Sequence, residues 1–213
     1  MEIRYQNFWS APKKLQTEVQ LIGRLDTSNK TKYKKKYVAG EITAREIAGL
    51  NHQGGLHYEL TIINEDELFC YLVIKGEHIK VNFLDGNLRI YLAYYFSPSK
   101  KYTDKVFLDE IWYNNYTSES SDTESYRMHF VFDEDGNVNY RKYDEVNQKT
   151  QDFESKEQSD VTGLYESYPD FEKYEDLIKL ERNFPLDIVP SKSNDPDRTD
   201  DSENKCLPPN WNE

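Results

Sequence analysis

The sequence predicts an α+β fold, in which a mostly antiparallel β-sheet meander of about seven or eight strands carries one C-terminal helix. Strand-like runs recur every 8–12 residues between residues 37 and 143, and no long helical pattern separates them. Two Asp-Gly turns each lie between a pair of these runs. Aromatic residues make up 14% of the chain, which is enough to build a core although only 37% of the residues are hydrophobic.

The N-terminal part is expected to contribute little to the sheet. Residues 17–25 (TEVQLIGRL) are predicted to form an early strand, and residues 26–36 are polar and are expected to form a loop. A short strand is predicted for residues 37–44 (YVAGEITA).

The strongest strand signals follow one another in the middle of the chain. Residues 67–75 (ELFCYLVIK) form a continuous apolar run that is typical of a central strand. Asp85-Gly86 and Asp135-Gly136 each lie between two strand signals and predict hairpins with type I′ turns. The predicted strands are residues 57–64, 67–75, 78–84, 88–96, 105–113, 126–133 and 138–143.

Two polar segments interrupt or follow these strands. Residues 114–125 (NNYTSESSDTES) are expected to form an acidic insertion between strands. Residues 144–163 are compatible with a loose helix or with a mobile loop, and the sequence does not decide between them.

The C-terminal region contains a pattern typical of a helix start. Pro169 suits the first helical position, Asp170 suits the positive end of the helix dipole, and Pro185 would end the helix. Phe171, Tyr174, Leu177 and Ile178 follow helical spacing and would form an apolar stripe against the sheet. We therefore expect a single domain over residues 1–189 and a disordered, acidic tail over residues 190–213.

The charge distribution favours a basic partner. The chain carries 27 basic and 39 acidic residues, a formal charge of −12, which repels phosphate backbones and anionic membranes. Residues 1–36 form an exception, because they hold nine basic and three acidic residues, or +6. The lysine-rich run at residues 30–36 is interpreted as a solvated loop or edge strand rather than as a contact for RNA or lipid.

No pattern in the sequence indicates catalysis, a metal or a cofactor. The four histidines lack the spacing of a zinc site, and the hairpin at Asp133 lacks both ends of a calcium-binding loop. There is no Gly-x-Ser-x-Gly motif and no phosphate-binding glycine loop. The absence of a signal-peptide pattern and of an 18-residue apolar run, together with only two cysteines, predicts a reduced cytoplasmic protein.

The remaining candidate for a functional surface is acidic and rich in tyrosine. Acidic side chains steer a basic partner, and tyrosine supplies large contact area at low entropic cost. The residues predicted to bind such a partner are Glu119, Asp122, Glu124, Asp133, Glu134, Asp135, Tyr116 and Tyr126.

Residues 164–184 (LYESYPDFEKYEDLIKLERNF) resemble C-terminal segments of bacterial immunity proteins that protect against contact-delivered, polymorphic (Rhs-like and type VI) toxins. Such families share no residue motif that can be transferred position by position. The resemblance implies a small acidic protein that binds and occludes one cognate toxin, here one with a basic surface or active site.

Two other functions remain open from the residues alone. The alternating strands at residues 57–96 could enclose a small apolar ligand in a β-barrel or sandwich without catalysis. A hydrolase whose groups meet only in space would place its chemistry at His57, His78 or His129.

Overall fold

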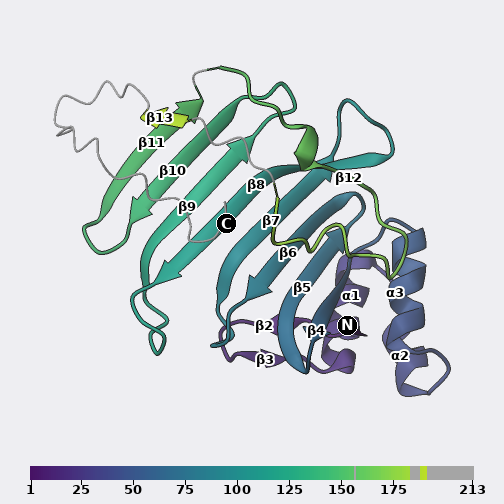
Figure 1. Ribbon diagram of the computed structural model, residues 1–213. Coiled ribbons are helices and arrows are strands. Elements are labelled where there is room, and N and C mark those ends of the chain that lie inside the picture. The colour runs from purple at the N-terminus through teal and green to yellow at the C-terminus, as the bar shows by residue number, and fades with distance from the viewer. Residues whose placement is uncertain (156, 183–187, 191–213) are drawn as a thin grey trace.

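The chain forms one large antiparallel sheet with three α-helices at one edge in a computed structural model, which describes residues 1–155, 157–182 and 188–190 (Figure 1). Within these residues ten strands follow the order β1-β4-β5-β6-β7-β8-β9-β10-β11-β13, and β12 pairs with the start of β8. A separate two-stranded hairpin, β2 and β3, lies against the sheet. The prediction of a mostly antiparallel sheet is confirmed, with more strands than expected, whereas the α-helices lie in the N-terminal part of the chain rather than in the predicted C-terminal segment.

The strands have the following bounds: β1 Glu2–Arg4, β2 Phe8–Trp9, β3 Lys14–Leu15, β4 Tyr58–Asn64, β5 Glu67–Lys75, β6 His78–Leu84, β7 Ile90–Pro98, β8 Lys105–Tyr116, β9 Glu124–Phe132, β10 Val138–Asp144, β11 Lys149–Ser155, β12 Tyr165–Ser167 and β13 Ile188–Pro190. Strands β5 and β6 coincide with the predicted segments, and the other central strands differ only at their ends. Period-two patterning identified these strands because consecutive hairpins bury one face of each.

Both predicted hairpins are present, but neither turn is of type I′. A type I′ turn requires positive φ at two central residues, whereas each of these loops has one such residue, Leu88 (φ 59°) in the first and Gly136 (φ 90°) in the second. The aspartate at the start of each loop accepts two backbone N–H groups. Asp85 bonds Asn87 and Arg89, at 2.9 Å each.

Gly136 also permits a close tertiary contact. A Cβ atom at this position would collide with the backbone of Ser159, whose N–H donates to the Gly136 carbonyl at 2.8 Å. The glycine therefore joins the β9–β10 hairpin to the segment that follows β11.

The predicted strand over residues 17–25 is wrong, because α1 occupies Glu18–Asn29. Thr17 and Gln20 form a capping box, in which each side chain accepts the other residue's backbone N–H. Leu21, Ile22 and Leu25 lie on one buried side of the helix. The capping and the helical spacing outweigh the local alternation of polar and apolar residues.

The predicted loop at residues 26–36 and the predicted strand at residues 37–44 are also wrong. Helix α2 spans Tyr33–Val38 and contains three of the lysines in the basic run, so this run is neither a loop nor an edge strand. Helix α3 spans Ala44–Gln53, begins with a second capping box between Thr43 and Glu46, and buries Ile47.

The polar segments flanking β9 contribute to the sheet. Strand β8 extends to Tyr116 and β9 begins at Glu124, so the acidic insertion is reduced to residues 117–123. Most of the segment left undecided, residues 144–163, is also ordered. It supplies β11, which pairs with β10, and the short 3₁₀ helix η1 (Thr162–Leu164).

The predicted C-terminal helix is wrong in its conformation. Residues 168–182 form successive turns, and Glu172 has a left-handed backbone (φ 68°), which interrupts helical geometry. Tyr174 and Leu177 are nevertheless fully buried, as their spacing predicted. We call residues 157–182 the strap. Except for Pro190, which ends β13, the predicted tail lies outside the described residues.

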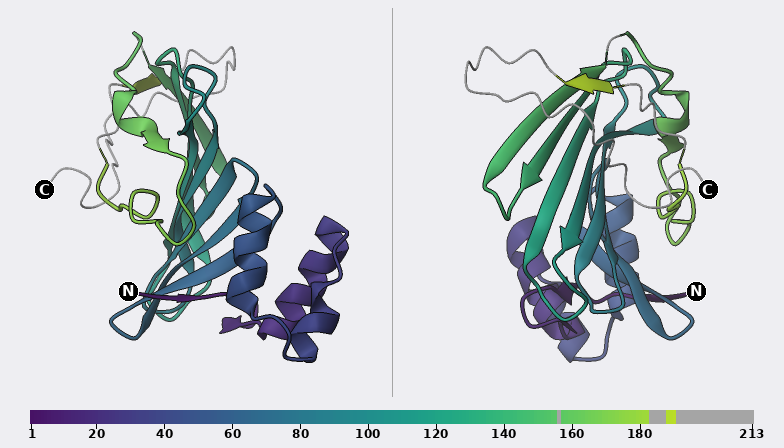
Figure 2. Two further views of the ribbon diagram at one scale, coloured as in Figure 1. Left: turned by 90° about the vertical axis from the view of Figure 1, so that its right-hand side faces the viewer. Right: turned by 60° about the vertical axis from the view of Figure 1, so that its left-hand side comes forward.

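The strap covers one face of the sheet and leaves much of the other uncovered. Figure 2 shows the strap on one side of the sheet and α1 and α2 on the opposite side. The strap face carries the buried core; across neighbouring strands this includes Leu72, Val81, Tyr94, Ile111, Phe130 and Tyr140. We call the other side the open face. The β2–β3 hairpin covers its β5–β7 end, where Phe8 packs with Tyr71 and Leu84.

A buried carboxylate fixes α1 on the sheet. Glu59 on β4 is 2% exposed and accepts two hydrogen bonds from Arg24 on α1, at 2.7 and 2.6 Å. His57 Nε2 lies 2.8 Å from the same carboxylate. Burial alone would raise the pKa of Glu59, but His57 and Arg24 together lower it.

A second carboxylate joins the strap to two N-terminal elements. Glu172 accepts hydrogen bonds from Arg45 on α3, at 2.7 and 2.5 Å, and from the Tyr5 hydroxyl. The Arg45 guanidinium and the Tyr5 hydroxyl lower the pKa of Glu172 to about 2. Tyr5 also stacks on Phe171, with ring centroids 5.9 Å apart.

We predict that Glu172→Gln weakens the acid dependence of folding. The folded pKa is below the ordinary value of 4.5, so the carboxylate stabilises the fold above that pH and loses its contribution as the pH falls towards about 2. Because solvent screens this pair, we expect a loss of about 1 kcal/mol at neutral pH and almost none near pH ~2. Urea unfolding across this pH range measures the difference.

Glu175→Gln is the matched control, because Glu175 is an exposed carboxylate on the same strap. Its stability should follow that of the unsubstituted protein at every pH. A Glu172→Gln effect that does not change with pH would contradict an electrostatic role for Glu172.

Candidate functional site

The residues predicted to bind a partner do not form one surface. Tyr116, Glu119, Asp122 and Glu124 lie where β8 passes into β9, whereas Asp133 to Asp135 follow the other end of β9. Strand β9 has nine residues, so the two groups are separated by roughly 30 Å at about 3.3 Å per residue. Tyr126 is placed differently again, because it is partly buried against the core on the face of the sheet that bears the strap.

The acidic residues of the 117–123 loop and its flanks are mostly paired within the protein. Asp122 lies 2.6 Å from Lys13, which joins the loop to the β2–β3 hairpin. Glu124 lies 3.2 Å from Arg127, and burial raises the pKa of Glu124 despite this cation. Glu119 is exposed.

The three acids of the β9–β10 hairpin also hold local structure. Asp133 accepts the N–H groups of Asp135 and Asn137, both at 2.9 Å. Glu134 accepts the backbone N–H groups of Lys100, at 2.6 Å, and Lys101, at 3.0 Å. The hairpin thereby orders the loop that precedes β8, and its partner-binding role stays a prediction.

The open face carries a continuous row of side chains across seven strands. Because antiparallel register places these residues directly opposite one another, they point to the same side of the sheet. The row runs Tyr71, Asn82, Ala93, Trp112, His129, Arg141 and Asp152. Sequence analysis did not identify this row, because it depends on the register of six strand pairs.

Aromatic and cationic side chains stack in the middle of this row. Trp112 lies parallel to His129 with ring centroids 4.0 Å apart, and Tyr143 stacks beyond them at 6.0 Å from Trp112. The Arg127 guanidinium lies 5.1 Å from the centre of the Tyr143 ring. Glu110 lies 2.9 Å from His129 Nε2 and holds the imidazole in place. Trp, Tyr and Arg are the residues most enriched at protein-binding hot spots.

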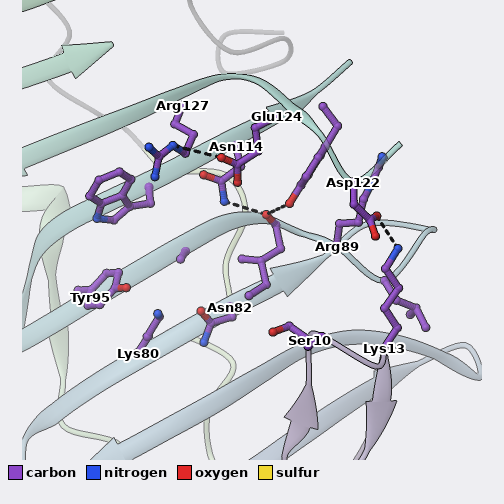
Figure 3. Close-up of a pocket in the computed structure, with 16 residues that line it drawn as sticks. Ser10, Lys13, Lys80, Asn82, Arg89, Tyr95, Asn114, Asp122, Glu124 and Arg127 are labelled. Atoms are coloured by element: carbon purple, nitrogen blue, oxygen red, sulfur yellow. Dashed lines mark hydrogen bonds and ion pairs between the residues drawn. The ribbon is translucent and has the colours of Figure 1, made fainter. Parts of the chain in front are cut away.

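A hollow of about 490 Å³ opens beside this stack, between the β2–β3 hairpin and the 117–123 loop. Figure 3 shows side chains converging on it from the hairpin and from β6 to β9. Of its lining residues only Ala11, Leu88, Ile90 and Ala93 are aliphatic, and the others are polar, charged or aromatic. These others are Ser10, Lys13, Lys80, Asn82, Arg89, Tyr95, Trp112, Asn114, Tyr116, Asp122, Glu124 and Arg127.

Several of the polar groups that line the hollow form hydrogen bonds within the protein, and these bonds fix the strands and the loop around it. Asn114 and the Tyr116 hydroxyl both donate to the Ile90 carbonyl at 2.9 Å (Figure 3). Burial and the neighbouring Glu124 raise the pKa of Tyr116 to about 12, so the hydroxyl remains a donor at neutral pH. Arg89 donates to the Ser118 carbonyl at 2.8 Å and fixes the 117–123 loop.

Asn82 is the exception among these polar groups. Its side chain is 1% exposed, yet neither its carboxamide nitrogen nor its oxygen has a hydrogen-bond partner within the described part of the chain. A buried amide without partners costs about 1–3 kcal/mol of stability. A buried and unpaired carboxamide beside a hollow is therefore a candidate for recognising a ligand.

Lys80 is the cation of the hollow for which the described part of the chain supplies no acidic partner. Lys13 pairs with Asp122, Arg89 with Asp85, and Arg127 with Glu124 and Glu145. The Lys80 ammonium instead lies 4.6 Å from the centre of the Tyr95 ring on the neighbouring strand. It is therefore available to a negative charge that enters the hollow.

A second hollow, of about 500 Å³, lies near the β9–β10 hairpin and includes Asp109. Burial raises the pKa of Asp109, and its Oδ1 atom has no partner among the described residues. Ser97 lies between Asp109 and His78, and its hydroxyl is 3.5 Å from His78 Nδ1. A hydrolytic triad requires the histidine in the middle, so this order does not activate the serine.

The other two histidines considered for catalysis lie elsewhere. His57 pairs with Glu59 at the α1 anchor, and His129 pairs with Glu110 on the open face. In the described ranges no group of three or more His, Cys, Asp or Glu residues is arranged to hold a metal ion. None of the helices described here is long and apolar enough to cross a membrane.

No protein-family model matches the sequence, and neither a curated protein nor a solved structure matches it significantly.

We predict that Asn82→Leu stabilises the protein by about 1–2 kcal/mol. Leucine has the same branched arrangement of side-chain heavy atoms as asparagine, and the substitution removes two buried polar atoms that lack partners among the described residues. The expected result is a higher midpoint of thermal and urea unfolding.

Asn139→Leu is the matched control, because Asn139 also lies on the open face but is exposed. It should change the free energy of unfolding by less than about 0.5 kcal/mol. If Asn82→Leu destabilises the protein instead, the carboxamide has hydrogen-bond partners in the folded state. Asn82 would then no longer be a candidate for recognising a ligand.

We also predict that Glu134→Ala destabilises the protein by about 1–2 kcal/mol, because the backbone N–H groups of Lys100 and Lys101 lose their acceptor. Asp135→Ala on the same hairpin should be nearly neutral, since that side chain is 72% exposed. Urea unfolding compares the two variants. Equal effects would show that Glu134 is an ordinary surface acid.

Proposed function

We propose that this chain is a non-catalytic protein that binds a protein partner on its open face, and that the partner is a bacterial toxin inactivated by binding. The observation that carries the proposal is the stack of Trp112, His129 and Tyr143 with Arg127, on a side of the sheet that the strap leaves uncovered. These side chains are half-buried, and aromatic and arginine side chains that are partly accessible on a rigid sheet suit a protein interface.

The charge of the chain supports a partner that is basic overall. A formal charge of −12 accelerates association with a cationic protein and disfavours nucleic acid. Within the partner interface we expect the aromatic stack to supply affinity and the acidic loops to steer the approach. Residues 164–182 of the segment that resembles immunity proteins lie in the strap, so their buried side chains contact the chain's own sheet rather than the partner.

The alternative of a small apolar ligand has less support. The aromatic side chains of the strap face fill the core, and the two hollows described above are lined mainly by polar, charged or aromatic residues. Apolar ligands bind in cavities lined predominantly by hydrophobic side chains.

The test is co-expression with the product of the neighbouring upstream gene, scored by growth rescue and by co-purification. We expect rescue, a stoichiometric complex, and a loss of roughly 30-fold in affinity for the Trp112→Ala variant, because interface tryptophans typically contribute about 2 kcal/mol or more. Calorimetry on the purified complex measures the affinity.

Tyr102→Ala is the control, because Tyr102 is 48% exposed but lies in the loop before β8, away from the open-face row. The affinity of this variant for the partner should equal that of the unsubstituted protein. If the complex instead tolerates Trp112→Ala and is lost when the charges of Glu119 and Asp122 are reversed, that result would assign the interface to the 117–123 loop. No toxicity and no complex would contradict the proposed function.

A further inference from the structure

We propose that the hollow beside Asn82 binds the C-terminal residue of a polypeptide, with its carboxylate at Lys80 and an aromatic side chain over Ala93. The proposal rests on the proposed function only for the identity of the polypeptide, which would be the toxin. The chemistry of the site follows from four side chains, Asn82, Lys80, Ala93 and Trp112.

Asn82 offers one donor and one acceptor that nothing in the described chain uses. In an extended residue the N–H and the carbonyl oxygen point to the same side, as they do in each hydrogen-bonded pair of an antiparallel sheet. A C-terminal residue in this conformation would donate its N–H to Oδ1 of Asn82. One of its carboxylate oxygens would accept from Nδ2.

Lys80 supplies the charge that a terminal carboxylate requires. It lies two residues before Asn82 on the same strand face, about 7 Å along β6. Figure 3 shows the carboxamide of Asn82 directed towards Lys80. The second carboxylate oxygen would therefore meet the Lys80 ammonium, and the other cations of the hollow remain with their acids.

Ala93 presents a small side chain between Asn82 and Trp112, but it is only 3% exposed, so a ring reaches it only when a neighbouring side chain moves. It lies directly opposite both residues in the sheet register, and its side chain is the smallest in the row. Two strand spacings separate Asn82 from Trp112, about 10 Å, which admits one aromatic ring in van der Waals contact with each side. His129 stacks on Trp112 from the β9 side, and the Arg127 guanidinium lies 5.9 Å from the centre of the indole ring, so the proposal places the ligand on the side of the indole towards β7.

Entry requires a side chain to move. Both carboxamide atoms of Asn82 are closed to solvent. Lys80, with its flexible stem on the same face, is the neighbour best able to swing away from the Tyr95 ring. A carboxylate that draws the ammonium off this ring would open the path to the carboxamide.

The site fits a terminal residue better than a nucleotide. One available cation suits a single carboxylate, whereas a nucleotide phosphate carries up to two charges. The short spacing between Asn82 and Lys80 also matches an N–H and a carboxylate on one residue. A nucleotide separates its base edge from its phosphate by a whole sugar.

The experiment is calorimetric titration of the full chain with N-acetyl-L-phenylalanine, N-acetyl-L-tyrosine and N-acetyl-L-tryptophan. We expect at least one to bind with a Kd on the order of 0.1–1 mM, which is typical of a small ligand with few contacts. The matching N-acetyl amino-acid amide, which lacks the carboxylate, should bind about tenfold more weakly. The side-chain amide signals of Asn82 in an NMR spectrum should shift on binding.

Three variants locate the site. Asn82→Leu should abolish binding while remaining folded, since we expect it to be more stable than the unsubstituted protein. Lys80→Gln should weaken binding of the acid about tenfold and leave binding of the amide unchanged. Lys149→Gln, which removes an exposed lysine on β11, is the control and should bind normally.

Several results would overturn the proposal. These are no saturable binding below ~10 mM, binding that survives Asn82→Leu, or equal binding of acid and amide. Tighter binding of adenosine monophosphate than of the acids would assign the hollow to nucleotides instead. These titrations need no partner. If they show no binding but the toxin complex still forms, only the terminal-residue site is rejected. Success without a complex rejects only the proposed function.

Discussion

Burial of one face of the sheet beneath the strap is the interaction on which the rest of the structure depends. Tyr174 and Leu177 of the strap are fully buried, and the Tyr174 hydroxyl lies 3.2 Å from that of Tyr58 on β4. Strand side chains alternate between the two faces, so covering one face determines which residues remain on the other. The strap thereby sets the composition of the open face without touching it.

The strands could be predicted from sequence because their signal is local. Strands β9 and β10 bury alternate residues over part of their length, β4 is buried on both faces, and each Asp-Gly loop keeps its neighbouring strands antiparallel. The helices α1 and α3 could also have been recognised, since the capping boxes at Thr17 and Thr43 are visible in the sequence. The strap could not, because a left-handed Glu172 held by Arg45 and Tyr5 is a tertiary effect.

The candidate site was much less predictable. Sequence analysis identified the acidic residues but could not show that Asp122 and Glu134 are occupied by Lys13 and by the backbone before β8. The open-face row has no sequence signal at all. Its members are separated by whole hairpins, and a shift of one residue in any register would break it. Nothing in the sequence around Asn82 marks it as part of a site. Only the strand register shows that it lies opposite Ala93.

The unpaired carboxamide of Asn82 is the point at which stability and binding oppose each other. Sequences that fold reliably satisfy or remove buried polar groups, and departures from that rule cluster at functional sites. Here the departure lies beside Lys80, which has no acidic partner among the described residues, and near the half-buried indole of Trp112. Packing alone would favour leucine at position 82, so the asparagine is best explained by a group that binds there.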